Sequence, residues 1–176
     1  MLSTTEREAA ISPAPSARPR LRLQPDQSVP TLLDGGWWPR SADPAAELPG
    51  LILALDERHG RVTRVMLGAA DWHALRPRRL RVDGPAGSRV VRLGWFATMP
   101  AGLLTAISAS DQRTDLVTIP PHTSERDAAA AMEQAAQAGN RDHAPAILAG
   151  ISAAARMPAG ATVGRAPVPA AGRRSS

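Results

Sequence analysis

The residues best suited to recognise a ligand stand together in one short stretch, residues 32–41. Two adjacent tryptophans, Trp37 and Trp38, lie there in a chain with four tryptophans, one phenylalanine and no tyrosine. An indole ring can stack on a planar group, and a neighbouring arginine can hold a carboxylate or a phosphate. The side chains of this stretch that could make such contacts are Asp34, Trp37, Trp38, Arg40 and Ser41. They predict a site that binds a ligand or a partner protein rather than a catalytic centre.

The backbone of the same stretch is predicted to form a shaped loop. Gly35 and Gly36 can adopt angles closed to other residues, and Pro39 favours an extended conformation at Trp38. Neighbouring side chains on extended backbone point to opposite sides. One tryptophan is therefore expected to be buried and the other at least partly exposed. In the alternative interpretation the pair is mainly structural, and an indole fills the space between a helix and a sheet.

A second candidate site is a stripe of arginines on predicted strands, Arg64, Arg79 and Arg81. If these side chains share one face of the sheet, they could hold a phosphate group. In the alternative interpretation they form a solvent-exposed face and pair with carboxylates. The carboxylates considered for this pairing are Asp56, Asp71 and Asp83.

The sequence contains no recognisable catalytic or metal-binding motif. It has no cysteine, which excludes disulfides, cysteine-based zinc sites and thiol catalysis. Serine-hydrolase, phosphate-loop and dinucleotide-binding motifs are absent. The histidines lack the short spacing of a metal-binding pair; they are His59, His73, His122 and His143. We therefore expect no catalytic residue, no metal and no cofactor, and favour a protein that is not an enzyme.

The charge of the chain is concentrated at its ends. There are 21 arginines, no lysine and a net charge of +5 over 176 residues. Residues 21–139 carry 13 arginines and 13 acidic residues, whereas residues 140–176 carry five arginines and one acidic residue. Because a folded nucleic-acid-binding domain usually gathers positive charge on one face, this balance argues against nucleic acid as a partner of the core, unless the arginines cluster.

No stretch of the sequence predicts a membrane span or an export signal. No apolar run approaches the roughly 18–20 residues needed to cross a bilayer. Glu6 and Glu8 stand where a signal peptide would be basic and then apolar. We expect a cytoplasmic protein that does not contact membranes.

The elements that would position these side chains predict an α+β domain. Asp43 and Pro44 begin a helix whose apolar face follows at the spacing i, i+3, i+4, i+7, namely Leu48, Leu51, Ile52 and Leu55. Pro49 is expected to kink or restart this helix. Period-two patterns predict strands at 20–24, 61–67, 79–83, 89–96, 103–108 and 114–119. A second helix is expected to begin at Thr123 or Ser124 and to run to about residue 137.

These elements suggest a mostly antiparallel sheet of five or six strands with two helices. Short connections favour a meander, which could curl into a small barrel. Residues 1–19 are predicted to be disordered, residues 20–139 to form the single domain, and residues 140–176 to be a mostly disordered basic tail rich in alanine, proline and glycine. One short helix could lie in that tail around Ile147, Leu148 and Ile151.

The sequence resembles an actinobacterial family known only as a domain of unknown function. The resemblance covers roughly residues 20–138, and its most specific part is an Asp-Gly-x-Trp-Trp-Pro-Arg-Ser signature at residues 34–41. Supporting strings lie at residues 47–49, 60–65, 78–84 and 90–94. The resemblance implies a compact α+β domain and no assigned activity.

The leading functional hypothesis is a binding or protein-interaction module that uses the Trp37–Trp38 loop. One alternative is a small barrel associated with nucleic acid and aided by its basic tail. The other is an enzyme whose site residues are not recognisable in the sequence. The salt dependence of binding distinguishes the interaction module from the nucleic-acid-associated barrel, because phosphate contacts weaken steeply as salt is added.

Overall fold

The computed structural model describes residues 18–25, 29–72 and 75–156. The described strands are β1 (Arg20–Leu23), β2 (Gly35–Trp38), β3 (Val62–Gly68), β4 (Arg79–Gly84), β5 (Gly87–Phe96), β6 (Leu103–Ser108) and β7 (Arg113–Thr118). The described helices are α1 (Pro44–His59), α2 (Glu125–Ala135) and α3 (Ala144–Arg156), and a 3₁₀ turn lies at Ala69–Asp71. The predicted α+β class is confirmed.

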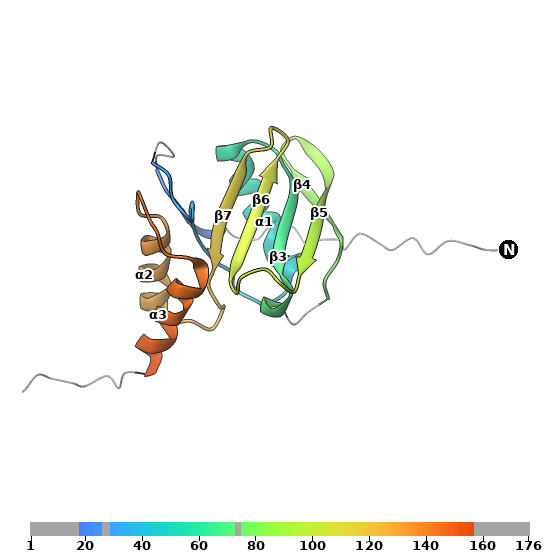
Figure 1. Cartoon of the computed structure of the whole chain (residues 1–176). Helices are drawn as coiled ribbons and strands as arrows, with labels where there is room; N and C mark the ends of the chain where they lie inside the picture. The colour runs from blue at the N-terminus through green and yellow to red at the C-terminus, as the bar shows by residue number, and fades with distance from the viewer. Residues whose placement is uncertain (1–17, 26–28, 73–74, 157–176) are drawn as a thin grey trace, which may run out of the picture.

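The seven strands form one curled sheet in the order β1-β2-β7-β6-β3-β5-β4 (Figure 1). All six predicted strands are present, but the sheet is mixed, because β2 pairs with β7 and β3 pairs with β5 in parallel. The predicted antiparallel meander is therefore wrong. The connection at 69–78 is long enough to carry the chain from β3 to the far edge, and β5 then returns between β3 and β4.

The seventh strand, β2, occupies the stretch predicted to be a loop. Its glycines serve close packing and not a turn. A Cβ atom on Gly35 would lie 2.1 Å from the carbonyl oxygen of Arg22, and one on Gly36 would lie 2.9 Å from the Cα of Met132. Only glycine lets β1 approach from the edge and α2 from above, so a pattern that reads as a loop forms a strand.

Helix α1 begins and ends as its sequence predicts. The Asp43 carboxylate accepts a hydrogen bond from the backbone N–H of Ala45 at 2.9 Å, and Pro44 occupies the first turn. Gly60 follows the last residue with a φ of 81°, in the left-handed region that favours glycine. The predicted restart near Pro49 does not occur, and α1 continues through it as one helix.

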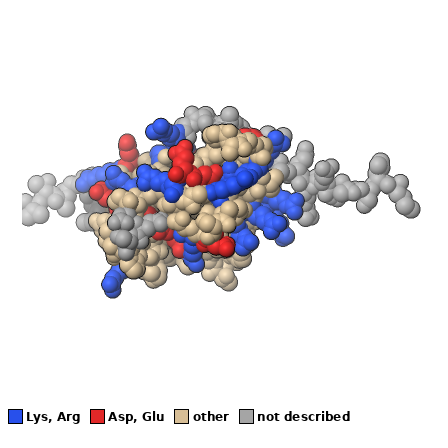
Figure 2. Space-filling model, turned by 90° about the horizontal axis from the view of Figure 1, so that it is seen from above, with Lys and Arg blue, Asp and Glu red and all other residues tan. Residues whose placement is uncertain are grey.

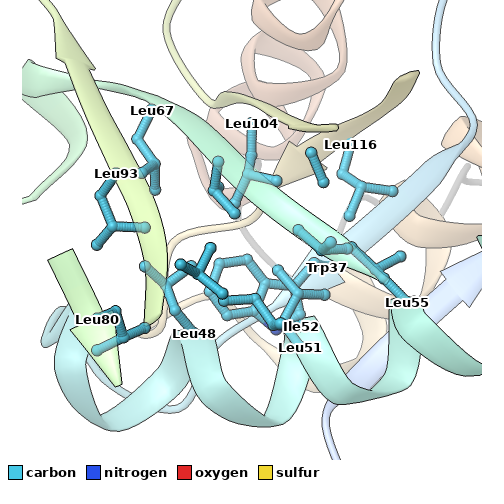
Figure 3. Packing of buried hydrophobic residues seen from close by; sticks show 14 of the residues in the cluster. Trp37, Leu48, Leu51, Ile52, Leu55, Leu67, Leu80, Leu93, Leu104 and Leu116 are labelled. Atoms are coloured by element: carbon cyan, nitrogen blue, oxygen red, sulfur yellow. The ribbon is translucent and has the colours of Figure 1, made fainter. Parts of the chain in front are cut away.

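Two hydrophobic cores lie on opposite faces of the sheet. Helix α1 covers the inner face, where its buried leucines meet Trp37 (Figure 3). Helices α2 and α3 lie beside β7 and cover part of the outer face (Figure 1). There the second core includes Trp38, Val117, Ile119 and Ile147. Among the described elements, neither α2 nor α3 packs extensively against the outer face of β3, β4 or β5.

Helix α3 lies within the segment predicted to be mostly disordered, and with it the described residues form three helices instead of the two predicted. The short helix expected around Ile147 is thus present and extends over Ala144–Arg156. Ala144 and Ile147 are buried against α2 and β7. The contact of α3 with α2 could not be predicted from the alanine-rich sequence. Alanine side chains produce only a weak apolar pattern, although they allow two helices to pack closely. None of the described helices is long and apolar enough to cross a membrane.

The contact of α3 with the sheet predicts a stability effect outside residues 20–139. Replacing Ile147 with alanine is expected to lower the free energy of unfolding by about 2 kcal/mol, because a buried side chain is truncated. Ala149 lies on the exposed side of the same helix, and Ala149→Ser should change stability by no more than about 0.5 kcal/mol. Chemical denaturation of both variants checks this. Equal small effects would place the domain boundary before α3.

Candidate functional site

The two tryptophans of β2 point to opposite faces of the sheet, as predicted, but both are buried. Trp37 is 1% exposed in the core under α1, and Trp38 is 8% exposed in the core under α2 and α3. The expectation that one indole is at least partly exposed is wrong. It fails because α2 and α3 cover the outer face of β2 and turn an exposed position into a second core.

The position above the Trp38 ring is already occupied by a side chain of the same domain. The guanidinium carbon of Arg20 lies 3.4 Å from the centroid of that ring. The same guanidinium donates to the carbonyl oxygens of Trp38 at 3.0 Å and Pro39 at 2.8 Å. Burial lowers the pKa of Arg20, and repulsion from Arg40 lowers it further. The indole N–H of Trp38 donates to the Pro120 carbonyl at 3.2 Å. The ring face and the N–H of Trp38 therefore both have partners within the domain.

Asp34 joins β2 to β7 at the point where their parallel pairing begins. Its carboxylate accepts a hydrogen bond from the backbone N–H of Asp115 at 2.7 Å, and its own backbone N–H donates to the Asp115 carbonyl at 2.7 Å. Burial raises the pKa of the Asp34 carboxyl, because the charged form loses water. Asp34 therefore connects two strands, and its carboxylate is not free to bind a ligand.

His59, the last residue of α1, lies close to this joint. Its Nδ1 is 2.7 Å from the hydroxyl oxygen of Thr114, a buried residue of β7. Burial lowers the pKa of His59, while Asp34 opposes and Arg58 reinforces that shift. A histidine beside a hydroxyl can activate a nucleophile, but Thr114 is only 2% exposed and has no access to a substrate.

The lowered pKa of His59 predicts a pH dependence of stability. The unfolded histidine binds a proton near pH 6.5 whereas the folded one does so only at lower pH. Stability is therefore expected to be retained above about pH 6.5 and to fall as the pH drops below it. The pKa of Asp34 is raised, so this residue has the opposite effect on the pH dependence. Its contribution to the free energy of unfolding is present at low pH and begins to be lost as the pH rises above about 3.8. Thermal melts from pH 7.5 to 5.5 should fall more steeply for the wild type than for His59→Asn; identical slopes would contradict this.

Arg40 and Ser41 organise the entry into α1. The Ser41 hydroxyl donates to one carboxylate oxygen of Glu47 at 2.9 Å, and the Arg40 backbone N–H donates to the other at 3.1 Å. Glu47 lies in the first turn of α1, where a negative charge is favourable. The exposed Arg40 guanidinium donates to the Arg18 carbonyl at 3.3 Å. Of the stretch 34–41, Arg40 is the residue that still offers an exposed charged group.

The arginines predicted on strands do share one face, and the structure adds one to them. Arg79 of β4 is paired with Arg92 of β5, and Arg92 is paired with Arg64 of β3. All three are exposed on the outer face. Their guanidinium groups make no ion pair or side-chain hydrogen bond with any residue in the part of the chain that the structure describes. We call these three residues the arginine row.

Arg92 is the member that sequence reasoning misses. It lies on the outward phase of the predicted strand 89–96, since its neighbours Val91 and Leu93 are buried, so its face could have been predicted. The position of Arg92 between Arg64 and Arg79 could not have been predicted, because it depends on the parallel pairing of β3 with β5.

Four other strand arginines, Arg22, Arg81, Arg89 and Arg113, are paired with carboxylates. The Nε atom of Arg81 lies 3.3 Å from Oδ1 of Asp83, and the Nε atom of Arg113 lies 2.8 Å from Oδ2 of Asp115. Asp56 pairs with Arg89 rather than with the predicted stripe. Figure 2 shows basic and acidic side chains interleaved over the upper end of the molecule. The pairing expected of a solvent-exposed face therefore holds for Arg81 but not for the arginine row.

Within the described ranges, no three histidine, aspartate or glutamate side chains gather where they could hold a metal ion. His73 lies outside the described residues. The exposed guanidinium groups of the arginine row can instead attract an anion electrostatically.

Comparison with protein families gives a match over residues 20–135 to DUF5994, described as a family of unknown function. Neither a curated protein nor a solved structure matches the chain. The match covers the strands, α1 and α2, and so most of the described domain. The predicted resemblance to a domain of unknown function is confirmed, and the chain belongs to the DUF5994 family.

Proposed function

We propose that this domain is a cytoplasmic, non-enzymatic interaction module whose contact surface is the arginine row, and that its ligand is an acidic segment of a partner protein. The observation that carries the proposal is the alignment of Arg79, Arg92 and Arg64 on three adjacent strands without a counter-ion among the described residues. The buried Trp37–Trp38 strand holds the sheet in shape and is not itself the contact.

The spacing of the arginine row favours an anion across it. Neighbouring strands lie about 4.8 Å apart, and like charges directly opposite one another are destabilising. Arg92 has an arginine on both sides. A carboxylate placed over Arg92 would relieve this repulsion and could accept two parallel hydrogen bonds from one guanidinium.

The side chains around the row favour a protein segment over nucleic acid. Val90 and Phe96 lie on the same face of β5 and are 53% and 46% exposed. The Phe96 ring bends back over Gly94, since a Cβ atom there would lie 2.8 Å from a ring carbon. Ile107 continues the row on β6. Apolar groups beside guanidiniums match a ligand with both carboxylates and aliphatic side chains, whereas single-stranded nucleic acid would be expected to use several stacking aromatics.

Substitution of Arg92 tests the proposal. A labelled peptide of alternating glutamate and leucine is expected to bind the full chain, and Arg92→Gln should weaken that binding about tenfold to a hundredfold, because charge-assisted hydrogen bonds are lost. Arg126 is exposed on α2, away from the row, and Arg126→Gln removes the same charge as a matched control. Fluorescence anisotropy measures both.

The same assay can contradict the proposal. Equal binding by both variants would show that the row is not the contact. Tighter binding of a single-stranded oligonucleotide of matched charge, with a steep salt dependence, would favour the nucleic-acid alternative.

A further inference from the structure

The free edge of β1 borders a groove that lies between this strand and α1. The groove has a volume of about 420 Å³ and runs between β1 and the outward flank of α1. Leu21 and Leu23 of β1 and Leu53 of α1 form its apolar part. Arg18 and Arg58 are exposed at its margin, together with Glu57.

Within the described part of the chain, the hydrogen-bond pattern of β1 leaves the backbone of two residues without a strand partner along this groove. The backbone N–H of Gln24 donates to the Asp34 carbonyl, which fixes the phase of the antiparallel pair β1–β2. Residues exchanging bonds alternate along such a pair, so Arg20 and Arg22 face β2. The backbone N–H and C=O groups of Leu21 and Leu23 then point to the free edge, where no other strand of the described sheet lies.

We infer that an extended segment of a partner protein adds to the β1 edge, with an aliphatic side chain in the groove and an acidic residue beside Arg18 and Arg58. Unpaired edge groups form main-chain hydrogen bonds with an added strand, and a neighbouring pocket selects alternate side chains. The flanking charges, two arginines against Glu57, set the preference for an acidic residue. The arginine row lies on the outer face of β3, β5 and β4, whereas this groove is lined by β1 and α1, so the two sites are separate.

The test uses the full chain and a short labelled peptide in which valine and threonine alternate before a C-terminal glutamate pair. A second peptide of the same sequence carries N-methyl groups on alternate residues, which remove the donors that edge pairing needs. Anisotropy titrations should show binding of the first peptide and a loss of about tenfold or more for the second. Equal binding of the two peptides, or no binding of either, would overturn the inference.

A matched pair of variants locates the site. Ala54 lines the groove on α1 and is partly exposed, and Ala130 is exposed on α2. Ala54→Glu places bulk and negative charge in the groove and should abolish peptide binding, while Ala130→Glu should leave it unchanged. Binding that Arg92→Gln weakens while Ala54→Glu leaves it unchanged would assign this peptide to the arginine row and overturn the inference. Melting temperatures confirm that each variant is folded.

Sedimentation of the unliganded chain decides between a partner segment and a second copy. A monomer over the concentrations of the titration supports the inference. A dimer that Ala54→Glu dissociates would assign the groove to a second copy of this chain and overturn the choice of partner.

Discussion

Replacing Trp37 with alanine is expected to lower the free energy of unfolding by about 3–5 kcal/mol, which is the usual cost of removing a buried tryptophan and a large share of a domain's stability. Trp37 is 1% exposed, and its ring stacks on Trp72 with centroids 5.9 Å apart. Leu51 and Ile52 of α1 pack on the same side (Figure 3). Truncation would therefore leave a cavity in this core.

Trp38→Ala should also be strongly destabilising, because Trp38 fills the second core and is the surface on which Arg20 lies. Its loss would leave the Pro120 carbonyl without the indole donor. Denaturant titrations of the two variants, followed by circular dichroism because an indole is removed, provide the measurement. A loss below about 1 kcal/mol for Trp38→Ala would mean that the ring contributes little packing, and would restore it as a candidate contact surface.

Part of the inner core was predictable from the sequence, because local patterns determine the buried face of α1 and the alternation of the strands. The apolar spacing of Leu48, Leu51, Ile52 and Leu55 specifies the buried face of α1 whatever packs against it. Strand alternation likewise placed Leu80 and Val82 inside and Arg79 outside. These assignments need no knowledge of which strand is adjacent.

The candidate sites depend on pairing and layering, which such patterns do not contain. Arg64 and Arg92 are 28 positions apart and become neighbours only through the parallel pair β3–β5. The burial of Trp38 depends on two alanine-rich helices, one of which lies in a segment with the composition of a disordered tail. A tryptophan pair thus looked like a contact surface because the layer that covers it carries almost no apolar signal.

Replacing Gly35 with alanine is expected to cost about 3 kcal/mol, near the upper end for overpacking, since the clash involves backbone that cannot rotate away. The added Cβ would lie 2.1 Å from the Arg22 carbonyl oxygen and 3.0 Å from the Cα of Leu23. Strand β1 would have to move away from β2, taking Arg20 from its place on Trp38. Gly150 of α3 has no atom within 4 Å of such a Cβ, and Gly150→Ala should be neutral or stabilising by up to about 1 kcal/mol, as usual in a helix interior. Denaturation measures both variants, and hydrogen exchange should show faster exchange at Arg20 and Arg22 in Gly35→Ala. Equal behaviour of the two glycine variants would mean that β1 does not approach β2 this closely, and would remove the edge strand on which the peptide groove depends.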